Sequence, residues 1–172
     1  MNENGLETFG TRLAEGRNFD ATIVTMPPKN SSTSPSGILV TRDVAKELFP
    51  DESALGKTVY TGTSQPVTIL GIIEHMHGSW PGWDKVGNVA LFPVITDETY
   101  ARYMVRARPG QRDAMMKMAE EALGKVDNGR VILRVRSLEY VAASSYAEDR
   151  AMALYLAVVI ALGSRSLGAT FR

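Results

Sequence analysis

The chain has 172 residues, of which 44% are hydrophobic and 22% charged, and its 19 lysines and arginines balance 19 aspartates and glutamates. This length fits one domain or two small subdomains, and the composition excludes both a disordered chain and, because cysteine is absent, a disulfide-stapled scaffold. Zero net charge removes the basic excess that displaces counterions from phosphates, so we expect no nucleic-acid partner.

The first predicted element is a helix at residues 6–17. Its apolar residues recur at helical spacing, and Gly16 can end it. No basic stretch followed by an apolar run precedes this segment, so the sequence shows no cleavable secretory signal. Residues 25–37 are rich in proline, serine and threonine and predict a flexible loop between two strands.

A strand and a short helix are predicted next. Residues 38–40 form a short apolar run, Thr41 can cap a helix, and apolar side chains then recur at helical spacing until Pro50.

Three more segments predict strands. Residues 57–60 and 67–73 are rich in β-branched side chains and flank a turn-forming stretch, a pattern typical of an antiparallel hairpin. Residues 89–94 predict a further strand, and Pro93 indicates that it lies at an edge or ends there.

The second half of the chain predicts a β-α-β unit. Residues 103–108 and 131–136 alternate with a period of two, as strands do. Two arginines share one face of each strand: Arg106 and Arg108 in the first, Arg134 and Arg136 in the second. Residues 111–126 between them combine an apolar helical stripe with i,i+4 ion pairs. We expect half of a ferredoxin-like sandwich.

The last predicted element is a long helix at residues 138–162, which Ser137 can cap. It is polar first and apolar last, and its uncharged run at 151–162 is shorter than the about 20 residues that cross a bilayer. The run predicts either a buried terminal helix or the first turns of a membrane helix. The change from mixed polar and apolar residues to apolar residues alone along the helix axis favours a helix that begins in water and ends in a lipid bilayer. Residues 163–170 predict a loop or frayed tail.

Two groups of side chains are candidates for partner contact. Trp80 and Trp83 flank a Pro-Gly pair in a loop, where large aromatic side chains anchor either the loop itself or a partner surface. Arg106 and Arg108, with the second pair of arginines, could form a cationic face for a carboxylate, a lipid headgroup or a partner. A solvated sheet face explains these arginines equally well.

Catalytic signatures are weak. His75 and His77 could face one way and bind a metal, but a site would need a third ligand from Glu74 or Asp84. Residues 56–58 imitate the end of a P-loop without its upstream glycine, and no serine lies in a G-x-S-x-G context. We therefore predict no catalytic residue, no cofactor and no metal, with a metal-dependent hydrolase at the two histidines as the least favoured alternative.

Five short motifs occur in a characteristic order. They are GRNF at 16–19, ILVT at 38–41, A-x-x-LFP at 45–50, LGK at 55–57 and ILGII at 69–73. In this order the sequence resembles the MacB-like periplasmic core domain of ABC transporter permeases, which carry an FtsX-like membrane region. Residues 165–170 are similar to the R-x-LGAT stretch that follows the second membrane helix in that family.

The resemblance implies an α+β fold. It comprises a β-rich subdomain with an N-terminal helix at residues 1–98, a porter-like β-α-β subdomain at 99–137, a stalk helix with a truncated membrane stub at 138–162, and a tail at 163–172. The family also begins with a membrane helix and another β-α-β half, which this sequence lacks, so we expect a fragment, a truncated reading frame or an internally deleted relative.

The same resemblance implies the function. We expect a domain of an inner-membrane permease that faces the periplasm or the cell exterior and acts in efflux or substrate release by mechanotransmission. Its implied partners are an ABC ATPase, a periplasmic adaptor or lipoprotein, the membrane through the last helix, and a second permease copy in a dimer. The alternative is a free-standing periplasmic module that binds a peptide, lipid or adaptor through the Trp80 and Trp83 loop.

Overall fold

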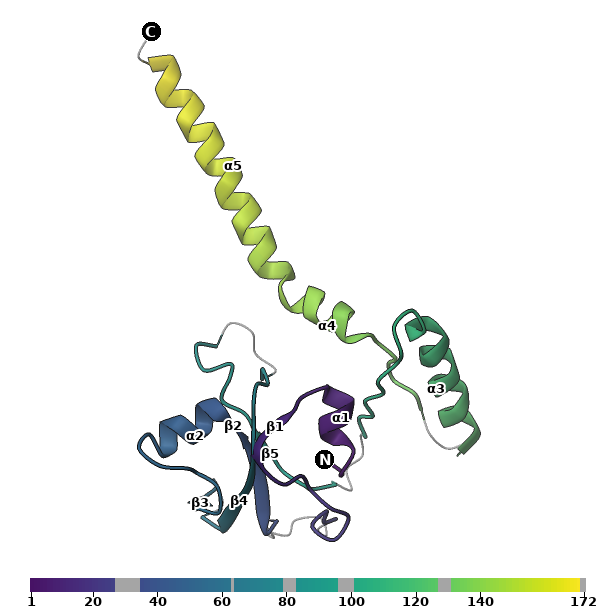
Figure 1. Cartoon of the computed structure of the whole chain (residues 1–172). Helices are drawn as coiled ribbons and strands as arrows, with labels where there is room; N and C mark the ends of the chain where they lie inside the picture. The colour runs from purple at the N-terminus through teal and green to yellow at the C-terminus, as the bar shows by residue number, and fades with distance from the viewer. Residues whose placement is uncertain (27–34, 63, 79–82, 96–100, 127–130, 171–172) are drawn as a thin grey trace. The chain divides into compact units, whose positions relative to one another are not determined.

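The computed structural model describes residues 1–26, 35–62, 64–78, 83–95, 101–126 and 131–170. The chain divides into two compact units, Met1–Arg106 and Ala107–Arg172. Strands occur only in the first unit among the described residues, and the long helices lie in the second (Figure 1). The predicted α+β class is confirmed.

The first unit is built on a mixed five-stranded sheet. Its strands are β1 (Leu13–Gly16), β2 (Gly37–Thr41), β3 (Thr58–Tyr60), β4 (Pro66–Ile73) and β5 (Ala90–Leu91). The order is β1-β4-β2-β5, and β3 also pairs with β4. Of the four pairs among these strands, β2 with β4 is parallel and the other three are antiparallel. The antiparallel β3–β4 pair confirms the predicted hairpin. The sequence predicts a strand at 89–94. The structure has strand β5 within this range and a single β-bridge between Thr25 and Val94.

Both faces of this sheet are buried, because the two helices of the first unit, α1 (Gly5–Phe9) and α2 (Arg42–Leu48), lie on opposite sides of it (Figure 1). One apolar cluster includes Ala45 of α2 and the other includes Leu6 of α1. The register of β2 against β4 shifts between Ile38 and Leu39. Strand residues alternate between the two faces, and the extra residue of β4 after Ile69 interrupts that alternation, so Ile69 and Ile72 lie in one cluster and Ile73 in the other.

The helix predicted at residues 6–17 is wrong in its second half. Helix α1 ends at Gly10, whose φ of 73° is the left-handed conformation that glycine adopts most easily. The amide of Thr11 then bonds the Leu6 carbonyl at 3.1 Å, which closes the helix end. The following residues pair with β4 as strand β1, because the open edge of β4 offers hydrogen bonds that an isolated helical turn cannot match.

The second unit contains helices α3 (Arg112–Val126), α4 (Leu138–Ser145) and α5 (Ala147–Thr170). Helix α3 confirms the predicted helix, but neither of the flanking segments, 101–108 and 131–137, forms a strand in the described part of the chain. The β-α-β prediction is therefore wrong for its two strands. A two-stranded ribbon is marginal by itself, and the alternating pattern alone provides no third strand.

The predicted continuous helix at 138–162 is interrupted at Tyr146. The hydroxyls of Ser144 and Ser145 both donate to the Val141 carbonyl, at 2.8 and 3.0 Å, and so compete with the backbone amides of that turn. Helix α5 starts anew with the amide of Arg150 bonded to the Tyr146 carbonyl at 3.0 Å. It continues to Thr170, so the predicted loop at 163–170 is also wrong.

In the part of the chain that the structure describes, no helix is both long enough and apolar enough to cross a bilayer.

Candidate partner-binding site

The loop that carries Trp83 is held by one buried hydroxyl. We call residues 83–89 the Trp83 loop. Thr41, at the end of β2, is 1% exposed. Its hydroxyl donates to the Gly87 carbonyl at 2.7 Å and accepts from the Val89 amide at 3.1 Å, while its own amide donates to the Val89 carbonyl at 2.9 Å. These bonds fix the end of the loop to the central strand of the sheet.

A charged contact ties the same loop to α2. The Lys85 ammonium and the Asn88 amide both donate to the carboxylate of Glu47. These hydrogen bonds lower the pKa of Glu47, and the carboxylate in turn raises the pKa of Lys85. All three side chains lie near the surface, so the contact orients the loop more than it stabilises the fold.

The Trp83 side chain itself is 49% exposed, although its carbonyl accepts the Val86 amide at 3.1 Å inside the loop. The backbone of the Trp83 loop is thus anchored while the indole stays about half exposed. Trp80, the other predicted contact, lies outside the described residues.

The two histidines that could bind a metal, His75 and His77, are both exposed. No three acidic, histidine or cysteine side chains form a metal-binding group within the ranges that the structure describes.

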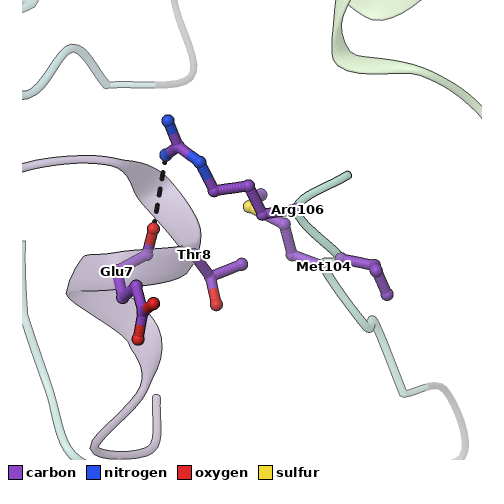
Figure 2. Close-up of a pocket in the computed structure, with 5 residues that line it drawn as sticks. Glu7, Thr8, Met104 and Arg106 are labelled. Carbon is purple, nitrogen blue, oxygen red and sulfur yellow. Dashed lines mark hydrogen bonds between the residues drawn. The ribbon is translucent and has the colours of Figure 1, made fainter. Parts of the chain in front are cut away.

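Arg106 lies against α1 instead of on a strand face. Its Nη1 donates to the Glu7 carbonyl at 3.3 Å. Glu7, Thr8, Met104, Val105 and Arg106 line an open hollow of about 330 Å³ within the first unit (Figure 2).

The other predicted arginines belong to the second unit. Arg108 is exposed, without a side-chain hydrogen bond or ion pair to any described residue. Arg136 lies 5.3 Å from the ring centre of Tyr140, a cation–π contact. Because neither segment is a strand, the shared arginine faces that a period of two predicts are not formed.

Sequence reasoning missed the role of Thr41. It predicted a helix cap, and Thr41 does precede α2, but its side chain makes no capping hydrogen bond. The hydroxyl is used 46 residues further along the chain, at Gly87. A threonine that ends a buried apolar run was the only available signal, and it does not distinguish these two uses.

The comparison with known protein families agrees with the sequence motifs. The model of the MacB-like periplasmic core domain matches residues 1–123. The crystal structure of the periplasmic region of MacB from Actinobacillus actinomycetemcomitans is similar at 18% identity and a TM-score of 0.41, over 73% of this chain and 54% of that one. The chain thus spans about half the length of that structure. No curated protein matches it. Since the family model covers well over half of the sequence, this chain belongs to the MacB-like periplasmic core domain family, the periplasm-facing domains of ABC transporter permeases.

Proposed function

We propose that this domain transmits motion within an ABC transporter permease. ATP-driven closure of separate ATPase subunits would move the last helix, which would displace the periplasmic domain against a substrate, an adaptor or a lipoprotein. The permease would act as a dimer in the inner membrane, in efflux or substrate release. None of the domain's residues would perform chemistry.

The observation that carries the proposal is the exposure of α5. Its large apolar side chains from 152 to 160 are between 47% and 70% exposed, and none of residues 150–160 is buried. A helix that packs on protein hides one stripe, whereas these apolar side chains are exposed all around the helix. An aqueous environment disfavours that surface, and the interior of a bilayer accommodates it.

A proline pair tests whether α5 acts as a rigid lever in the complete permease. Ala157→Pro places proline inside α5, where it removes a backbone hydrogen bond and costs about 3 kcal/mol. Ala147→Pro is the matched control, because Ala147 is the first residue of α5 and proline is tolerated there. We expect A157P to abolish transport while ATP hydrolysis continues, and A147P to preserve both activities. Normal transport by A157P would contradict the lever.

A second candidate function is a binding module for a peptide, lipid or adaptor at the Trp83 loop. The anchored backbone and the half-exposed indole favour it. Trp83→Ala should weaken capture of such a ligand at least tenfold, since interface tryptophans often contribute 2 kcal/mol or more, while Trp83→Phe should retain part of the affinity. Binding by W83A as tight as by the unmodified chain would exclude the loop as the site.

A further inference from the structure

At the end of the first unit, the chain contacts the N-terminal helix α1. Segment 101–106 contains no helix or strand. Its last residue, Arg106, nevertheless extends its guanidinium to α1 and donates to the Glu7 carbonyl, across 99 positions of sequence. Figure 2 shows the side chain lying over the end of this helix.

The C-terminal end of α1 leaves room for this guanidinium, because Gly10 has no side chain there. Gly10 closes the helix with a φ of 73°, and its amide donates to the same Glu7 carbonyl at 3.0 Å. A Cβ placed on Gly10 would lie 1.9 Å from Nη1 and 2.8 Å from Cζ of Arg106. The cation therefore occupies the space that a side chain at Gly10 would need. It also lies where the last helical carbonyls concentrate negative charge.

Arg108 has no side-chain partner in the described residues, and Pro109 and Gly110 form a turn in which Gln111 donates its amide to the Arg108 carbonyl at 3.0 Å. Gly110 has a φ of 76°. The second unit begins at Ala107.

We propose that Arg106, the Glu7 carbonyl and Gly10 form a latch that holds segment 101–106 on the first unit, so that the joint between the units begins at Ala107. When the latch opens, these six residues become free chain. At about 3.3 Å for each residue, six extended residues span roughly 20 Å, which is the most that this segment can add to the joint. The latch is thus a conformational device that sets the length of the connection, and it does not depend on the proposed transport function.

Backbone NMR relaxation of the full 172-residue chain tests the latch directly. Arg106→Ala removes the guanidinium, and Arg108→Ala is the matched control two residues away. We expect the ¹⁵N order parameters of residues 103–105 to fall from values typical of ordered backbone to below about 0.6 in R106A, and to stay unchanged in R108A. Unchanged order parameters in R106A would overturn the proposal.

Proteolysis supplies a second readout that does not depend on spectra. Chymotrypsin cleaves after Tyr103, a site that both arginine variants retain. When opening is fast, cleavage follows the population of the open form, so loss of a charge-assisted hydrogen bond should speed cleavage roughly tenfold in R106A alone. Equal cleavage rates in R106A, R108A and the unmodified chain would contradict the latch.

Gly10→Ala tests the latch at the residue that faces the guanidinium. The new methyl group would displace the guanidinium, so G10A should mobilise residues 103–105 as R106A does. Adding G10A to R106A should then increase their mobility no further. The amide shifts of Leu39 and Ile69 report whether the core remains folded. If residues 103–105 stay ordered in a folded G10A chain, the guanidinium is not seated on Gly10 and the proposal is wrong.

Discussion

The two units differ in what their apolar residues pack against. In the first unit the apolar residues of β2 and β4 are buried on both faces of the sheet, and Leu39, Ile69 and Ile73 are completely inaccessible. In the second unit α3 is an amphipathic helix with one apolar stripe, yet it buries no residue. An amphipathic pattern therefore specifies a surface that can be buried, and burial itself requires a partner that the sequence pattern does not supply.

The difference lies in long-range pairing. Strand β4 contacts three other strands, so each of its apolar side chains meets a neighbour from a distant part of the chain. In contrast, the segments that flank α3 have no ladder partner among the described residues. We expect the stability of the chain to reside in the first unit.

The largest effect is expected from a pair of leucine-to-alanine substitutions, one in each unit. Leu39→Ala removes a completely buried side chain and should lower the free energy of unfolding by about 2–5 kcal/mol. Leu133→Ala changes a side chain that is 65% exposed and should stay within about 0.5 kcal/mol. Urea denaturation measures both. Similar losses in the two variants would show that the second unit has a core of its own.

Thr41→Val has the next largest effect. It keeps the shape of the side chain but leaves the Gly87 carbonyl and the Val89 amide without their partner, which should cost about 1–3 kcal/mol. Thr41→Ser retains the hydroxyl and should recover most of this loss. Thermal unfolding provides the measurement. If T41V is as stable as T41S, the hydroxyl does not hold the Trp83 loop.

In the second unit, local hydrogen bonds should decide the structure. Replacing Ser144 and Ser145 by alanine removes both bonds to the Val141 carbonyl and should stabilise the helix by about 0.5–1 kcal/mol. We expect α4 and α5 to merge, with a helical Cα chemical shift at Tyr146. A non-helical shift that persists there would assign the interruption to another cause.

The smallest effect concerns pH. The hydrogen bonds from Lys85 and Asn88 lower the pKa of Glu47 from its ordinary 4.5. Because the folded-state pKa is below the unfolded one, the contribution to stability is fully present above about pH 4.5 and is lost as the pH falls through the folded-state pKa. Glu47→Gln should therefore flatten the acid side of the stability profile. Identical profiles from acid titrations of E47Q and the unmodified chain would contradict this contact.

Much of the first unit could be predicted from local patterns. The β-branched runs became β3 and β4, the short apolar run became β2, and the segment that ends at Pro50 became α2. Phe19, part of a family motif, is a buried core residue at 3% exposure. These predictions succeeded because hydrophobic side chains at strand or helix spacing found neighbours on the sheet.

The candidate site was less predictable. Trp83 is exposed, and the partner roles predicted for Trp80, Trp83, Arg106 and Arg108 stay predictions. The contact from Arg106 to α1 could not be foreseen, because an arginine in an alternating segment indicates only a polar face. The function of Thr41 depended equally on a residue far along the chain.

By itself, the sequence determined which segments are apolar, where glycine and proline interrupt them, and to which family the chain belongs, because these properties depend on side-chain chemistry and on neighbours a few positions away. Only the tertiary structure decided that residues 13–16 extend along β4, that the Thr41 hydroxyl holds the Trp83 loop, and that Arg106 lies on Gly10. Each of these outcomes depends on hydrogen bonds between residues tens of positions apart, and the energy of such bonds exists only once the chain has folded.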